Sequence, residues 1–293
     1  MRKYVFLAVV VTVIYFFQSF FLPTGGIGAD SLSYFGIASD LPQLKTNLFP
    51  LGFPVLIKIF HFIFQDYFWA GKILNISMVT MILLFSYVKK FYFRETVLLF
   101  AGKTFFFAFN LVISEGLFLF LLYFLFYFFH ERFQNKISSR HFVFYASAIL
   151  ILLFTVRYSG IYIYLGTGVF WLWMLLRRRI FAFQKDLLKV LVVSGAGIIA
   201  YLSFNYFVYG SFTGEHLRGA PARIYPVYVL RNILAMVNVI DPFIGIKPAS
   251  NSFVSIAFQV GLMLIDLLLL RYFVKLVMRK KLDLQMEFHY LLW

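Results

Sequence analysis

The chain has 293 residues, of which 62% are hydrophobic and only 13% are charged. Soluble domains contain about 45–50% apolar and about 25% charged residues, so the charges here are too few to cover a water-exposed surface. With a mean hydropathy of +0.86, this composition excludes a soluble enzyme and a disordered tail, and it predicts an integral membrane protein. The absence of cysteine excludes disulfide bonds, thiolate nucleophiles and zinc–thiolate sites.

Apolar runs recur along the whole chain. A membrane-spanning helix needs about 20 mostly apolar residues, and shorter runs can also span. The first run lacks a small-x-small cleavage site, which favours a helix over a signal peptide. The sequence thus predicts an all-α transmembrane bundle, a single domain over residues 1–293, with about eight spans at 4–22, 66–88, 96–113, 116–129, 142–156, 160–176, 190–209 and 253–270.

Basic residues gather at alternate ends of these spans. The chain has 27 Lys and Arg against 12 Asp and Glu, a net charge of +15. Basic clusters mark cytoplasmic loops, so we expect the amino terminus to be cytoplasmic, and the basic excess does not indicate nucleic-acid binding. The clusters are Arg2 and Lys3; Lys89, Lys90 and Arg94; Arg132, Lys136 and Arg140; Arg177 to Arg179 with Lys185 and Lys189; and Arg271, Lys275 and residues 279–281.

The opposite side of the bundle carries the two long loops. These outer segments, 23–65 and 210–252, contain Pro, Gly, Asn and Asp, and only they leave room for chemistry. Within the first, residues 50–65 are amphipathic and begin at a proline, so we expect a helix lying in the outer interface. Residues 286–293 start another apolar run, so the chain is either a fragment or ends in an interfacial anchor at Trp293.

The first outer acid, Asp30, follows a glycine-rich turn and begins a short helix that includes Tyr34 and Ala38. A nucleotide-binding loop fits poorly here, because no Gly-Lys-Ser/Thr follows the glycines. Taken alone, Asp30 is typical of a helix N-cap.

The wider pattern favours a functional site. The residues of this pattern are Asp30, Tyr34, Ala38, Pro50, Gly52, Phe53 and Pro54, residues 110–115 and residues 157–160. In these residues, and in order and topology across roughly the first 210 residues, the chain resembles the C-type (GT-C) polytopic membrane glycosyltransferases, including the protein mannosyltransferases and lipid A aminoarabinose transferases. The resemblance implies transfer of a sugar from a polyprenyl-phosphate carrier to a glycan, lipid or protein acceptor, on the outer face of a bacterial inner or plasma membrane. A non-catalytic scaffold or a lipid-linked-sugar flippase is the alternative.

The resemblance also implies roles for single residues. Asp30 would be the general base, and Arg157, Glu115 and Tyr34 would bind the donor phosphate, with a divalent metal at Glu115 left open. Each has a simpler alternative: Glu115 could cap a helix with Ser114, and Arg157 could reach lipid head groups.

Asp40 is the reserve for the base, although Leu41 and Pro42 after it suggest a turn. His216, Arg218 and Arg223 are candidate acceptor or phosphate contacts, with a solvated loop as the alternative. The five histidines never occur at zinc spacing. Among the acids only Asp266 is expected within a span, which disfavours a proton-coupled carrier.

Overall fold

The computed structural model describes residues 2–17, 23–176, 181–214 and 217, with isolated helical residues between 257 and 275. Throughout these residues the regular elements are helices, which confirms the all-α class. Four of them are long and apolar enough to cross a membrane: α4 (Tyr67–Lys89), α7 (Ser114–Phe133), α8 (Ser139–Val156) and α10 (Phe181–Tyr209). By length and composition, these helices are compatible with a membrane protein.

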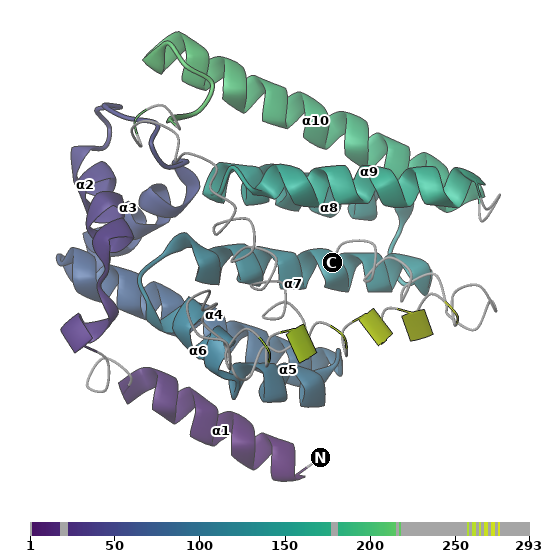
Figure 1. Cartoon of the computed structure of the whole chain (residues 1–293), viewed down its shortest axis with the longest axis horizontal. Coiled ribbons are helices and arrows are strands. Elements are labelled where there is room, and N and C mark those ends of the chain that lie inside the picture. The colour runs from purple at the N-terminus through teal and green to yellow at the C-terminus, as the bar shows by residue number, and fades with distance from the viewer. Residues whose placement is uncertain are drawn as a thin grey trace.

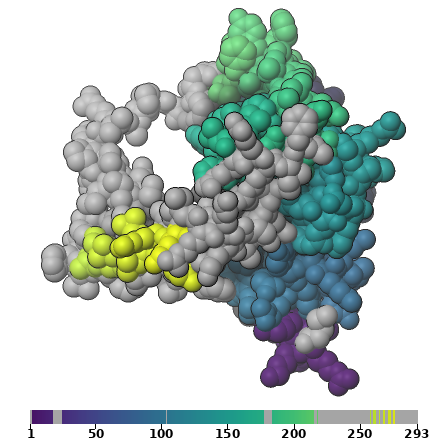
Figure 2. All heavy atoms as spheres, turned by 90° about the vertical axis from the view of Figure 1, so that its right-hand side faces the viewer, coloured from purple at the N-terminus to yellow at the C-terminus, as the bar shows by residue number. Residues whose placement is uncertain are grey.

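These helices run back and forth along one direction (Figure 1). The 16-residue α1 (Arg2–Phe17) and the 17-residue α9 (Gly160–Leu176) lie along the same direction as the four long helices. Figure 2, which looks onto the end where α1 begins, shows purple α1 at one edge and green α10 at the opposite edge, with the blue and teal helices between them. The described basic clusters belong to this end of the bundle, which we call the basic end.

The predicted continuous span at 96–113 is wrong. Two eight-residue helices, α5 (Phe93–Phe100) and α6 (Lys103–Asn110), occupy this stretch. The helix breaks at Gly102, whose backbone is extended and which lacks the side chain that would favour a continued helix. The pair still carries the chain from the end of α4 back to its beginning, where Lys72 of α4 binds the carbonyl of Asn110. Each later helix therefore runs in the direction that the sequence predicts.

The other described spans differ from their predictions by small amounts, except that α10 begins at Phe181 rather than 190. This early start includes Asp186, which is buried, so the expectation that only Asp266 lies within a span is wrong. Arg132 donates to Asp186 Oδ2 from Nε at 3.0 Å and Nη2 at 2.7 Å, and Ser139 donates to Oδ1. The ion pair compensates the buried charge. Asp266 and most of 253–270 lie outside the described residues.

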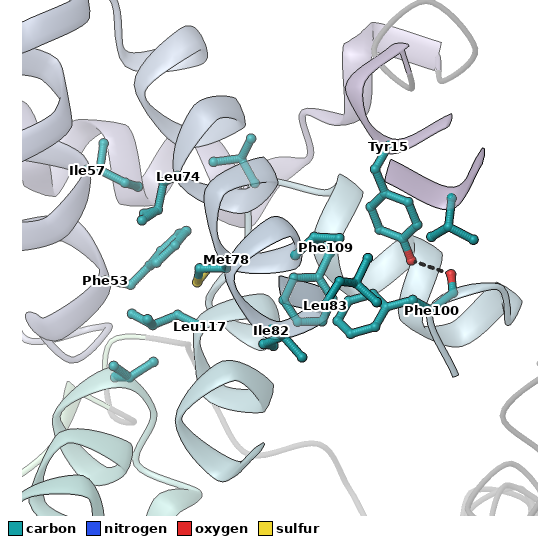
Figure 3. Close-up of a cluster of buried hydrophobic side chains, with 14 of the residues drawn as sticks. Tyr15, Phe53, Ile57, Leu74, Met78, Ile82, Leu83, Phe100, Phe109 and Leu117 are labelled. Carbon is teal, nitrogen blue, oxygen red and sulfur yellow. Dashed lines mark hydrogen bonds between the residues drawn. The ribbon is translucent and has the colours of Figure 1, made fainter. Parts of the chain in front are cut away.

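Two apolar clusters form the core. The first joins α1 to α7 and includes Phe53, Met78 and Leu117 (Figure 3). At its edge the hydroxyl of Tyr15 donates to the carbonyl of Phe100 at 2.9 Å. The second cluster joins α7 to α10. Because α7 contributes to both clusters, it links the two halves of the bundle.

The segment predicted as the first outer loop, residues 23–65, forms two short helices at the end of the bundle opposite the basic end, α2 (Ala29–Asp40) and α3 (Gly52–Phe64) (Figure 1). The amino terminus of α3 sits on the last turn of α8. A Cβ atom on Gly52 would lie 2.7 Å from the carbonyl oxygen of Thr155, so only glycine permits this approach. Phe53 and Ile57 then enter the first apolar cluster and fix the helix in place.

The turn before α3 is held by three other segments. Asn47 Nδ2 donates to the carbonyl of Ser211 at 3.0 Å, and the hydroxyl of Tyr158 donates to the carbonyl of Asn47 at 2.9 Å. The amide of Leu51 donates to the hydroxyl of Tyr201 at 3.0 Å. The turn around Pro50 is thus fastened to the end of α10 and to the segment that contains Arg157.

Candidate active site

Asp30 lies in the first turn of α2 and is exposed. It is not the N-cap, because the cap is Gly28, whose amide donates to Ser31 Oγ at 3.0 Å. Its charge still suits the position, since a carboxylate near a helix amino terminus interacts favourably with the backbone dipoles. The capping interpretation of Asp30 is therefore wrong, and its carboxylate remains accessible from solvent.

Tyr34, one helical turn after Asp30, points into the protein and is only 3% exposed. Its hydroxyl forms a hydrogen bond of 2.8 Å with Ser114 Oγ at the start of α7. Burial raises the pKa of Tyr34 to about 12, while the hydrogen bond with Ser114 acts in the opposite direction. The charges of Glu115, Arg157 and Asp30 also act on this phenol. Tyr34 is thus neutral at physiological pH and lies among all three candidate charges.

Glu115, in the first turn of α7, and Arg157, at the end of α8, form an ion pair. Arg157 Nη1 lies 2.5 Å from Glu115 Oε1 and 3.2 Å from Ser114 Oγ. Neither simpler alternative describes this arrangement: Ile113, not Ser114 or Glu115, occupies the N-cap of α7, and the Arg157 guanidinium is directed at protein groups. The side chains are 34% and 39% exposed for Arg157 and Glu115, so an incoming anion can reach the pair.

The structure thus brings Tyr34, Glu115 and Arg157 together around Ser114, with Asp30 one turn away on α2. The segments that supply them are far apart in sequence, and each is a helix terminus or a helix surface rather than a free loop. We call Tyr34, Ser114, Glu115 and Arg157 the outer cluster. It combines one cation, one anion and two hydroxyl groups that can donate or accept.

The remaining candidates lie elsewhere. Asp40 is at the opposite end of α2, is partly exposed and pairs with Lys45 at 2.9 Å, so it does not join the outer cluster. His216, Arg218 and Arg223 lie outside the described residues.

The outer cluster does not fit a metal site. Over residues 2–17, 23–176 and 181–214, no three His, Asp or Glu side chains gather as potential metal ligands. Glu115, the predicted ligand, has Arg157 as its partner, and a guanidinium at this distance opposes a second cation. We therefore assign no chemical step to a metal.

A second group of polar residues beneath the outer cluster was missed by the sequence analysis. Lys72, Asn75 and Asn110 are all fully buried, and Lys72 Nζ donates to the carbonyl of Asn110 at 2.6 Å. The available signal was Lys72 itself, since a lysine inside an apolar run of spanning length marks a functional site by default.

An apolar cavity of about 390 Å³ lies within the bundle, between α4, α5, α6, α7 and α9. Its walls include Phe100, Phe109, Leu119 and Phe126, with Tyr123 among the few polar groups. A cavity of this size and lining is suited to an apolar ligand.

Comparison with protein-family models found no match to this chain. Comparisons with curated proteins and with solved structures also found none.

Proposed function

We propose that this chain is a membrane glycosyltransferase that moves a sugar from a polyprenyl-phosphate carrier to an acceptor hydroxyl at the outer membrane surface. The observation that supports this most strongly is the outer cluster. Arg157, Ser114 and the buried Tyr34 come from three separated parts of the chain and meet one helical turn from Asp30, whose carboxylate is accessible. A stable fold alone does not require a reachable ion pair at this place, because such pairs contribute little to stability.

The chemistry assigns each group a task. The Asp30 carboxylate accepts the proton of the acceptor hydroxyl as the acceptor oxygen bonds to the anomeric carbon. The bond between that carbon and the phosphate oxygen breaks, and its electron pair leaves with the polyprenyl phosphate. Arg157 and the hydroxyl groups of Ser114 and Tyr34 stabilise the charge on this leaving group. Glu115 holds the guanidinium in place until the phosphate replaces it as a partner.

The membrane arrangement in this proposal follows the charges. The basic end faces the cytoplasm, and α2 and α3 lie at the outer surface. At about 1.5 Å per residue, the 13 residues of α3 span about 20 Å, which is less than a bilayer core of about 30 Å. We therefore place α3 in the outer interface and the isoprenoid chain of the donor in the apolar cavity. The whole chain, in a bacterial inner or plasma membrane, would cross about eight times.

The test uses the chain reconstituted in vesicles that contain polyprenyl-phosphate sugars radiolabelled in the isoprenoid chain, with a heat-treated cell-envelope extract as the source of acceptor hydroxyl groups. The measurement is release of polyprenyl phosphate, because this product forms whichever acceptor takes the sugar. Asp30→Asn should lower the release rate by about 10²- to 10⁴-fold, the usual contribution of a general base. Asp40→Asn is the matched control: this acid lies on the same helix but pairs with Lys45 away from the outer cluster.

Two results would contradict the proposal. If the donor crosses the bilayer intact and no polyprenyl phosphate is released, the chain is a flippase. If neither release nor movement occurs with any donor of this class, the scaffold alternative holds. Full activity of Asp30→Asn would remove Asp30 as the base and leave the donor site to be tested through Arg157.

A further inference from the structure

Lys72 is the most buried charged side chain of α4. It lies in the second turn of this helix, is 0% exposed, and donates from Nζ to the backbone carbonyl of Asn110 at 2.6 Å. Its ammonium also lies 5.7 Å from the ring centroid of Phe68. An ammonium group inside a membrane protein is costly, so its retention at a place where an apolar residue would fit indicates a function.

The contact of Lys72 is one of three that hold the same loop. Asn75, one turn further along α4, donates from Nδ2 to the carbonyl of Leu111 at 2.8 Å. The amide of Val112 donates to the carbonyl of Gly26 at 3.2 Å. Residues 110–113 are therefore fixed from below by α4 and from the side by the turn that precedes α2. We call these residues the tethered loop.

The tethered loop connects the outer cluster to the turn that precedes the candidate base. Its carboxyl end leads directly into Ser114 and Glu115, and its Val112 is bonded to the turn four residues before Asp30. Any shift of this loop would change the distance between the candidate base and the groups that face the leaving phosphate. Such distances matter, since a displacement of about 1 Å can reduce a rate by about 10²-fold.

The polar contacts of this region are incomplete, which argues against a purely stabilising role. Among the described residues, Asn75 Oδ1 and both polar atoms of the Asn110 side chain are buried without a hydrogen-bond partner. Each buried polar atom left unpaired costs about 1–3 kcal/mol. Leucine at position 110 would avoid that cost, so stability alone would not select this amide.

We propose that Lys72 and Asn75 are positioning residues, which hold the tethered loop so that Ser114, Glu115 and Arg157 keep their geometry relative to Asp30. Neither touches the substrate. The kinetic part of this proposal rests on the proposed glycosyl transfer, but the anchoring of the loop can be measured without it.

The kinetic test compares Lys72→Met and Asn75→Leu with wild type, per molecule of folded protein. Both variants should lower kcat/KM for the donor by about 10- to 100-fold. Ser194→Ala is the matched control, because Ser194 is also a fully buried polar residue but donates within its own helix, α10, to the carbonyl of Val190. It should leave kcat/KM unchanged. A merely structural role would lower the melting temperature and leave kcat/KM per folded molecule intact.

A double-mutant comparison tests whether Lys72 acts through the outer cluster. If it does, Lys72→Met should have little further effect on donor KM once Arg157 has been replaced by Met, because coupled residues are not additive. Full additivity of the two changes would overturn the proposal.

The anchoring itself is measured with a nitroxide label at Ile113→Cys, which is straightforward in a chain without cysteine. Mobility of the label should rise in Lys72→Met and in Asn75→Leu. A label at Leu84→Cys, on the exposed face of α4, should not respond. An unchanged label at Ile113 would overturn the proposal, even if activity falls. A mobilised loop in a chain that transfers no sugar would support the anchoring and contradict only the proposed function.

Discussion

Replacing Arg157 with Met tests the outer cluster most directly, because stability and donor binding should respond by different amounts. In the resting protein the guanidinium pairs with Glu115 at 2.5 Å and donates to Ser114 at 3.2 Å. Both ionic side chains are about one-third exposed or more, so the pair should contribute only about 0.2–1 kcal/mol. Ser114 keeps its bond to Tyr34, so the second lost bond adds about 0.5–1.5 kcal/mol.

The free energy of donor binding should decrease by more than the free energy of unfolding does. A hydrogen bond between charged groups contributes about 1.5–3 kcal/mol, which corresponds to about 10- to 150-fold in affinity. Arg157→Met should therefore weaken binding of polyprenyl phosphate by that factor, while the melting temperature falls by only a few degrees. Arg157→Lys should lie between, since a lysine retains the charge but loses the bidentate geometry.

The assay titrates purified protein in detergent with polyprenyl phosphate and follows thermal unfolding of the same samples. Lys45→Met is the matched control, because it breaks an exposed pair with Asp40 and removes one positive charge from the same end of the bundle. Equal affinity of wild type and Arg157→Met would refute the assignment of Arg157 to the phosphate. An equal loss in Lys45→Met would show that net charge, rather than the outer cluster, attracts the anion.

Three further predictions follow from the first outer loop. Asp30→Ala should lower the melting temperature by only a few degrees, because Asp30 does not cap its helix and only its favourable interaction with the helix dipole, about 0.3–1 kcal/mol, is lost; a loss of about 2 kcal/mol would contradict the cap assignment. Gly52→Ala should destabilise the protein by about 1–3 kcal/mol, since its Cβ would lie 2.7 Å from the carbonyl of Thr155; unchanged thermal unfolding would disprove this contact. In sealed cells a membrane-impermeant thiol reagent should label Ser33→Cys but not Ser138→Cys, and the opposite pattern would invert the proposed topology.

The amount of fold that the sequence predicts depends on how strongly each helix is determined by its own residues. The apolar run at 160–176 matches α9 because composition and length decide a helix in a membrane. The prediction of one span at 96–113 was wrong because the helix breaks at Gly102, a single residue within an otherwise apolar stretch. The early start of α10 was missed since Asp186 is tolerated there only through its partner Arg132, which is 54 residues away.

The site shows the same division. The sequence alone identifies Glu115 and Arg157 as candidates, because a charged side chain at the predicted outer end of an apolar span is costly unless it has a partner or a function. Their mutual contact, and the place of Ser114 between them and Tyr34, depends on how α2, α7 and the end of α8 pack. The sequence shows a lysine at position 72 within an apolar run, but it does not predict what this lysine binds. Its partner is a backbone carbonyl, which a residue of any type can supply.

The buried pair at the basic end has a consequence for how the bundle is assembled. Arg132 and Ser139 are synthesised before Asp186, and until α10 is in place their polar groups depend on water at the membrane surface. The carboxylate of Asp186 replaces that water when α10 packs against α7 and α8. Packing of α10 therefore completes the polar contacts of α7 and α8. A chain that stops before residue 186 would leave Arg132 and Ser139 without this carboxylate partner.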